Sequence, residues 1–216
     1  MASPAATWSA LIHGLSGGAL LGQSIQTTTR MVEGWFLASM AGIVIGSVIG
    51  ISSTARTYLQ PSLEFLRPLP DSAIIPPAIA LFGLGSKMVL AVVILGSLWP
   101  TLLATVQGFA LVEPILKEVS RTLHLSRSAF IWKIGLPNAL PDIIGGMRLS
   151  ATVALILTVV CEMLAGQEGL GTAVLLVPRS YQAPDLYAGL ILLGLVGLLT
   201  SYVLLLGEHF VLPWRS

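Results

Sequence analysis

Three long stretches of the chain contain no charged residue, and they constrain the fold more than any other feature. Residues 34–55, 88–112 and 186–207 are uncharged runs of 22, 25 and 22 residues. A helix needs about 20 apolar residues to cross the hydrocarbon of a bilayer, so each run is long enough for one crossing. Hydrophobic residues make up 55% of the 216 residues and charged residues only 10%, whereas soluble domains carry about 25% charged residues. The sequence therefore predicts an all-α integral membrane protein.

Two further segments bring the prediction to about five membrane-spanning helices. Residues 72–86 supply only 15 uncharged positions, so a span here must begin near Pro61 and carry charge inward. The segment from Ile143 to Ala165 has Arg148 near one end and Glu162 near the other, as expected where charged ends lie at interfaces or inside protein. The predicted spans of this single transmembrane domain are 31–52, 61–83, 86–110, 142–165 and 186–208.

The distribution of Lys and Arg predicts the orientation, because cytoplasmic loops of membrane proteins are enriched in these residues. With five spans, residues 56–71, 113–148 and the C-terminus share one face, which holds eight of the 11 cations. We expect that face to be cytoplasmic. The opposite face holds Arg30, Lys87 and Arg179, a weak indication of an anionic solute.

The N-terminus is then expected outside, with residues 3–20 as an amphipathic helix on that surface. Residues 1–30 lack the basic start and continuous apolar core of a signal peptide. We therefore expect that a preceding span is missing from this chain. Within the first predicted span, Gly42, Gly46 and Gly50 recur at every fourth position, which favours close packing against a neighbouring helix.

The only long polar connection, residues 113–137, lies on the predicted cytoplasmic face. Pro114 suits a first helical position, and an apolar stripe follows at helical spacing. We expect Ser126 to cap a second short helix that two Leu-Pro pairs, at residues 136–137 and 140–141, end before the next span. On pattern alone, the segment is either a helical hairpin on the membrane surface or an element that binds a partner.

The residues of this loop also resemble a known family. Glu118-Val119-Ser120, three residues, His124, nine residues and then Ile134-Gly135-Leu136-Pro137 follow the spacing of the cytoplasmic EAA loop (E-A-A, three residues, G, nine residues, I-x-L-P) of bacterial ATP-binding cassette importer permeases. Similarity to the subgroup that imports sulfonates, taurine, nitrate and related compounds covers residues 3–213. Two departures are visible: Val119-Ser120 replaces the paired alanines, and His124 replaces the glycine.

The resemblance implies a type I importer permease fold, in which this loop seats in a cleft of a separate ATPase subunit. The residues it implies in coupling are Leu116, Lys117, Glu118, Val119, Ser120, Arg121, Leu123, His124, Leu136 and Pro137. It further implies a second permease copy, an extracytoplasmic solute-binding protein and the bacterial inner membrane. ATP and Mg²⁺ would bind the partner ATPase, with no cofactor in this chain.

A semi-polar stripe in the fifth segment is a candidate wall for solute translocation. Arg148, Thr152 and Glu162 recur at helical spacing, and Thr158 lies beside them. The alternative is that Arg148 only anchors the interface and Glu162 only satisfies a neighbouring helix. The sequence alone leaves both open.

Several activities are disfavoured by missing motifs. The chain has no phosphate-binding G-x-x-x-x-G-K-[ST] stretch, a single cysteine and three widely separated histidines. The net charge of +1 offers no basic footprint for nucleic acid. A transport subunit without enzymatic activity is the main prediction. Half of an ion-coupled secondary transporter, or a membrane scaffold, are the alternatives.

Overall fold

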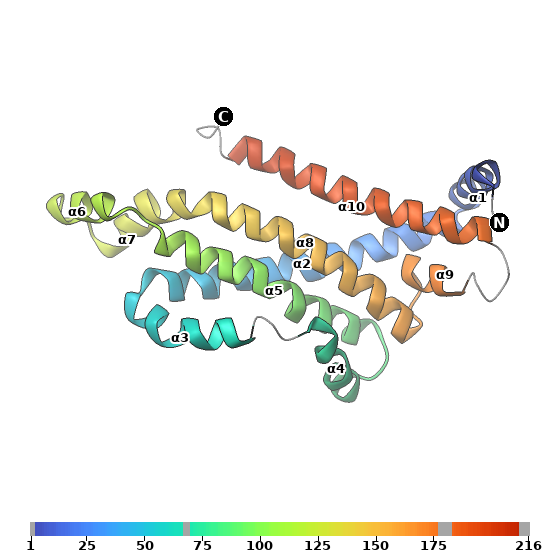
Figure 1. Ribbon diagram of the computed structural model, residues 1–216, viewed down its shortest axis with the longest axis horizontal. Coiled ribbons are helices and arrows are strands. Elements are labelled where there is room, and N and C mark those ends of the chain that lie inside the picture. The colour runs from blue at the N-terminus through green and yellow to red at the C-terminus, as the bar shows by residue number, and fades with distance from the viewer. Residues whose placement is uncertain (1–2, 67–69, 177–182, 212–216) are drawn as a thin grey trace.

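The computed structural model describes residues 3–66, 70–176 and 183–211, and within them every regular element is a helix. Four helical runs are long and apolar enough to cross a membrane: Ala19–Ile51, Ser86–Ala110, Ser128–Ala165 and Ala183–His209. Figure 1 shows them along the long axis of the molecule. The elements are α1 (Pro4–Ser16), α2 (Ala19–Ile51), α3 (Ser53–Leu66), η1 (Asp71–Ile74), α4 (Ile75–Phe82), α5 (Ser86–Ala110), α6 (Pro114–Thr122), α7 (Arg127–Phe130), η2 (Ile131–Gly135), α8 (Leu136–Ala165), α9 (Leu170–Leu176) and α10 (Ala183–Val211).

Glycines on α2 bring it unusually close to α5. A Cβ at Gly46 would lie 2.7 Å from the Leu102 carbonyl oxygen and from the Thr105 Cβ, and one at Gly50 would lie 2.8 Å from the Phe109 Cβ. These distances leave no room for any side chain. The close helix packing expected from the glycine spacing is thus confirmed.

The same contacts show that α2 and α5 run in the same direction. Gly34 faces Val93 near one end of the pair, and Gly50 faces Phe109 near the other. The chain between α2 and α5 must therefore return along the length of the bundle. By contrast, α8 runs opposite to both helices, because Gly108 of α5 packs on Ala139 at the start of α8.

The predicted span over residues 61–83 is wrong as a single helix. In the described part of the return segment, α3 ends at Leu66, η1 is a single 3₁₀ turn, and α4 contains only eight residues. Prolines explain the interruptions, because Pro70, Pro76 and Pro77 cannot donate a backbone hydrogen bond. Figure 1 shows α3 and then α4 along one flank of the bundle.

The boundaries of two other helices also differ from the predictions. Helix α2 begins at Ala19 and contains Arg30 and Glu33, so the first charged residues do not mark its start.

In the loop between α5 and α8, Ser126 caps α7 as expected, with its Oγ accepting from the Ala129 N–H at 3.2 Å. The Leu-Pro pairs do not end that helix, because the π-helical turn η2 leads directly into α8. A π turn shifts the backbone pairing and lets the helix continue.

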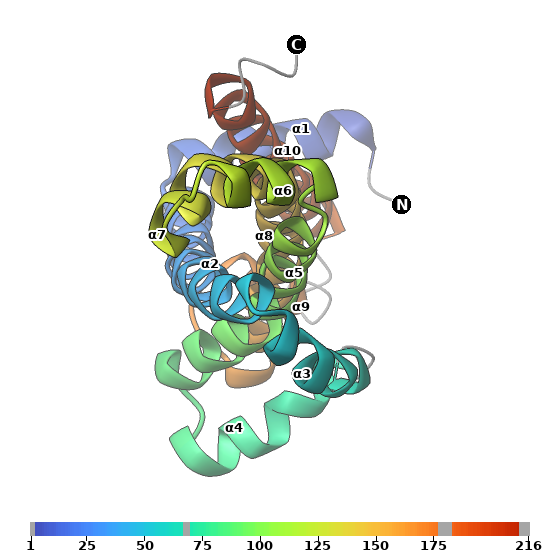
Figure 2. The same cartoon turned by 90° about the vertical axis from the view of Figure 1, so that its left-hand side faces the viewer.

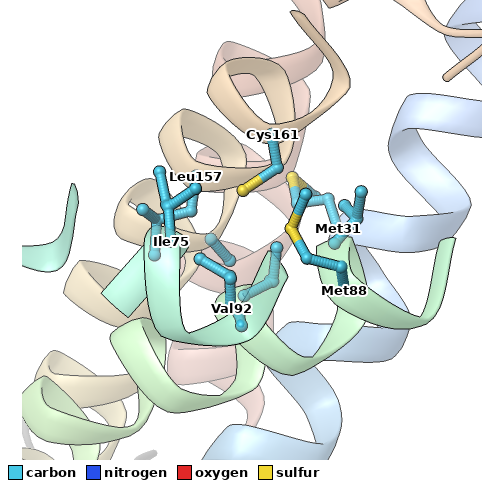
Figure 3. Close-up of a cluster of buried hydrophobic side chains, with 10 residues drawn as sticks. Met31, Ile75, Met88, Val92, Leu157 and Cys161 are labelled. Atoms are coloured by element: carbon cyan, nitrogen blue, oxygen red, sulfur yellow. The ribbon is translucent and has the colours of Figure 1, made fainter. Parts of the chain in front are cut away.

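The main core lies where four elements meet. Met31 of α2, Ile75 of α4, Met88 of α5 and Cys161 of α8 are all at most 5% exposed and belong to one hydrophobic cluster. Figure 3 shows these side chains converging. The short helix α4 is therefore anchored to the bundle by its own apolar residues. In contrast, α10 is mostly exposed along its apolar length, as expected for a helix that faces lipid or another subunit.

Replacing Gly46 with Ala should destabilise the protein by about 1–3 kcal/mol, because the new methyl group would overlap the backbone of α5. The measurement is thermal unfolding of the purified protein in detergent. Gly22→Ala is the matched control, since Gly22 lies on the same helix with nothing within 4 Å of the added Cβ. Equal melting temperatures for the two variants would contradict the close α2–α5 contact.

Candidate functional site

Helix α6 projects from one end of the molecule and exposes an apolar strip. Figure 1 shows α6 and α7 together at that end, far from α1 and α9, and Figure 2 views the molecule from the same end. Leu111, Ile115, Val119 and Leu123 are spaced by four residues and are 68%, 67%, 44% and 64% exposed. Ile115 and Val119 lie on α6, Leu123 lies at its end, and Leu111 lies just before it, at the end of α5. Four large exposed apolar side chains in one short segment indicate a surface that binds a partner. We call these four residues the apolar strip.

The strip differs in part from the stripe expected from the sequence. Val119 and Leu123 were expected, whereas Leu116 is only half-exposed. Leu111 and Ile115 were missed. Ile115 lies four residues before Val119 on the same helix, so helical spacing predicts it, whereas Leu111 lies between the predicted span 86–110 and α6.

The polar side chains of α6 are also accessible. Glu118 and Arg121 are exposed, and neither takes part in the two ion pairs found in the described part of the chain. The Glu118–Arg121 pair that could have explained both residues is therefore absent there. Ser120 is half-buried. The side chain of Lys117 lies outside the described residues.

His124 ends α6 in the left-handed conformation, with φ of 49°. The His124 N–H donates to the Arg121 carbonyl at 3.0 Å, and the Leu125 N–H donates to the Ser120 carbonyl at 3.0 Å. These two bonds form a Schellman motif, which usually places glycine at this position. His124 thus adopts the backbone conformation that glycine adopts most easily, and its Nδ1 lies 3.1 Å from the Thr122 carbonyl oxygen.

Leu136 and Pro137, the end of the EAA-like pattern, lie at the start of α8. Leu136 packs against the buried cluster formed by Phe109, Ala139 and Ile143, while Pro137 is exposed. Leu136 therefore anchors the loop to the bundle. We call this cluster the packed base of the loop.

The four candidates for a translocation wall do not form one cluster. Arg148 is paired with Glu208 of α10, and Thr152 is exposed. Thr158 is fully buried, and its hydroxyl donates to the Ala154 carbonyl at 2.8 Å within the same helix. Glu162 is also fully buried and faces α2 and α9. The stripe seen in the sequence is divided between separate helix contacts.

Glu162 is the centre of a polar cluster near the opposite end of the molecule from α6. Its carboxylate accepts from the Thr27 hydroxyl at 2.9 and 3.1 Å, from the Arg30 guanidinium at 2.9 Å and from the Gly171 N–H at 3.1 Å. The Leu170 N–H donates to the Thr27 hydroxyl oxygen at 2.9 Å. We call this set the Glu162 clamp. It fixes the α8–α9 turn onto α2.

Two glycines in the turn make room for the carboxylate. A Cβ at Gly169 would overlap the Glu162 carboxylate, and a Cβ at Gly171 would lie 3.0 Å from the Glu162 Cβ. Arg30 also donates to the Glu168 carbonyl. The clamp favours the structural interpretation of Glu162 over direct contact with solute. It occupies Arg30 as well, so this cation is already neutralised inside the protein.

The described residues contain no group of three or more His, Cys, Asp or Glu side chains that could hold a metal ion. What they contain is a multi-pass helical bundle with a polar clamp at one end and a projecting helix with an exposed apolar strip at the other. These features define a membrane transport component that engages a partner. The chain belongs to the family of binding-protein-dependent transport system inner membrane components, whose family model matches residues 38–213.

Individual relatives agree with the family match. The chain is 33% identical over 199 residues to a putative aliphatic sulfonates transport permease protein of Bacillus subtilis, covering 92% of this chain and 72% of the relative. It is 28% identical over 188 residues to a taurine transport system permease protein of Escherichia coli, covering 87% and 68%. It is 29% identical over 187 residues to a bicarbonate transport system permease protein of Synechococcus elongatus, covering 86% and 67%.

The family membership decides between the functions considered from the sequence. The chain is a permease component of an ATP-binding cassette importer in the inner membrane, a transport subunit and not an enzyme. A binding-protein-dependent system implies an ATPase and a solute-binding protein as partners. The alternatives of an ion-coupled carrier and a non-transporting scaffold are set aside on this ground.

Replacing Glu162 with Gln should destabilise the protein by about 3 kcal/mol, because it leaves the Arg30 charge largely buried without its partner. Thermal or denaturant unfolding of the purified protein measures the effect. Glu208→Gln is the matched control, since it breaks the more exposed pair with Arg148 and should cost about 0–1 kcal/mol. If the two variants were equally stable, the Glu162 clamp would not hold the turn.

Replacing His124 with Gly should leave α6 intact or stabilise its end by up to about 1 kcal/mol, because glycine adopts the left-handed conformation without steric cost. His124→Val should loosen the same turn, since a branched side chain disfavours positive φ. Amide hydrogen exchange over residues 114–125 measures both effects. Slower exchange in the valine variant than in the glycine variant would contradict the assignment of this bend.

Proposed function

We propose that α6 is the element through which the ATPase subunit drives this permease. The apolar strip is the observation that carries the proposal, because such a surface is unstable in water unless a partner covers it. Val119 and Leu123 would fill the centre of the contact. Glu118 and Arg121, exposed and not paired with each other, would make charge-assisted hydrogen bonds at its rim. ATP and Mg²⁺ would bind the ATPase.

The return segment would be a fifth membrane crossing. The parallel course of α2 and α5 supports this assignment, since the chain has to traverse the bundle between Ile51 and Ser86. Its backbone interruptions are acceptable in a bilayer only where protein covers them, and Ile75 and Ala78 of α4 are indeed buried against the bundle. With five crossings, α6 and the C-terminus would share one face, with the N-terminal helix α1 on the other. The excess of Lys and Arg on the α6 face supports its assignment as cytoplasmic.

A rigid-body mechanism follows from the packed base of the loop. Closure of two ATPase subunits would push two copies of α6, and Leu136 would pass the displacement to α5 and α8. The second permease copy would be another molecule of this chain. At the outer face, a binding protein would deliver the solute.

The solute would be a small oxyanion or organic anion of the sulfonate, taurine or nitrate type. The relatives' names support this class, as they specify aliphatic sulfonates, taurine and bicarbonate. The Arg30 guanidinium already pairs with the Glu162 carboxylate. Other groups in the described part of the outer face would therefore have to bind the solute. Arg148, Thr158 and Glu162 would then act on translocation indirectly, through contacts between helices, whereas Thr152, which is exposed, would remain free to line the path.

Val119→Asp should abolish stable association of the permease with its ATPase, because a carboxylate would be buried in the apolar contact without a partner. The measurement is co-purification of the ATPase subunit, and its hydrolysis rate, from cells that express the whole transporter. Glu118→Ala should weaken the same association. Leu84→Asp is the control, since Leu84 is 63% exposed and lies in the turn at the other end of the molecule. ATPase recovery with Val119→Asp equal to wild type would remove the proposal.

A further inference from the structure

A hollow of about 350 Å³ lies behind α6, at the junction of the membrane-spanning helices with the cytoplasmic loop. Its walls come from four parts of the chain that are far apart in sequence: the end of α2 with the start of α3, the end of α5, α6 and α7. The residues that matter for its chemistry are Ser53, Arg56, Phe109, Ser120, Arg121 and Phe130. Its volume lies within the range of small-ligand sites.

The hollow is electropositive. Arg56 and Arg121 line it, and no acidic side chain is among its described lining residues. Neither arginine makes an ion pair in the part of the chain that the structure describes, where the pairs are Arg30–Glu162 and Arg148–Glu208. Two uncompensated guanidinium groups in one concavity attract an anion, and guanidinium matches phosphate geometry particularly well.

The floor of the same hollow is apolar. Phe109 is 5% exposed and belongs to the packed base of the loop, and Phe130 of α7 is half-buried. A free inorganic anion would leave this apolar surface in contact with water. A ligand that combines a phosphate with an apolar part would cover both surfaces.

The depth of the hollow in the membrane identifies such a ligand. Helix α5 contains 25 residues, about 37 Å of helix, which exceeds the hydrocarbon thickness of about 30 Å. Phe109, the penultimate residue of α5, therefore lies at the level of the lipid headgroups. With α6 on the cytoplasmic side, this is the inner leaflet, where anionic headgroups meet basic residues of membrane proteins.

We propose that this hollow binds the phosphodiester headgroup of an anionic phospholipid, with Arg56 and Arg121 on the phosphate and Phe109 and Phe130 beneath the glycerol. The inference rests on the proposed orientation of α6. Because the lipid would contact α3 and α6 together, it would brace the coupling helix against the end of the bundle. Arg121 also lies at the rim of the proposed contact with the ATPase, so the test uses Arg56, which that contact does not require.

The test is native mass spectrometry of the transporter released from nanodiscs that contain equal amounts of phosphatidylglycerol and phosphatidylcholine. Wild-type protein should retain phosphatidylglycerol preferentially, and Arg56→Gln should lower that retention about fivefold, the effect expected for one cation at a membrane surface. Lys133→Gln is the matched control, because Lys133 is an exposed cation at the same end that does not line the hollow. It should retain the lipid as wild type does.

Three outcomes would overturn the proposal. Equal phosphatidylglycerol retention by wild type and Arg56→Gln would show that the hollow is not the site. An equal loss of phosphatidylglycerol with Lys133→Gln would show that the lipid is held by the general positive charge of this surface and not by the hollow. Release of the lipid by inorganic phosphate would show that an anion alone fills the site.

The same preparations separate this inference from the proposed coupling function. Arg56→Gln is expected to lose lipid while the ATPase still co-purifies. Loss of the ATPase with unchanged lipid would assign the hollow to a protein contact instead. Reagents that label Trp132→Cys on intact cells, without crossing the membrane, would refute the orientation itself, since Trp132 is 68% exposed at the α6 end.

Discussion

The close contact between α2 and α5 is the constraint on which the rest of the structure depends. Membrane helices gain little from the hydrophobic effect when they associate, so close backbone approach has to supply the packing energy. Gly42, Gly46 and Gly50 allow that approach by removing the side chains that would separate the helices. Because the two helices run parallel, their contact also imposes a return segment along the bundle. The broken course of α3, η1 and α4 is a consequence of this topology.

The two ends of the bundle have opposite character. At the end that holds α9, the Glu162 clamp satisfies a buried charge with several donors and fixes the α8–α9 turn. At the other end, α6 leaves apolar and charged side chains without partners in the described chain. A polar network whose members are all hydrogen-bonded is rigid, whereas an exposed apolar surface is stabilised when a partner covers it. The contrast is consistent with a permease that receives mechanical work at one end only.

His124 shows that a residue that departs from a family pattern can keep the backbone conformation that the pattern requires. The resemblance implies glycine at this bend, and histidine stands in its place. In the structure the residue takes the left-handed conformation, and the Schellman hydrogen bonds are both present. Histidine is among the non-glycine residues enriched in this region of backbone space. The bend is therefore kept at a modest conformational cost.

The sequence by itself determined that this protein resides in a lipid bilayer and which class it belongs to, and it indicated which loop to test for partner binding. Uncharged runs of about 20 residues, such as 88–112, are readable because the bilayer imposes one length on every crossing, and the loop motif is local in sequence. Only the tertiary structure decided that Arg30 lies within a helix and pairs with Glu162, 132 residues away. It also divided the stripe of Arg148, Thr152 and Glu162 among different contacts and interrupted the second predicted span. These outcomes depend on which helices meet, because a charge or a proline inside a membrane is tolerated only when a distant segment supplies its partner.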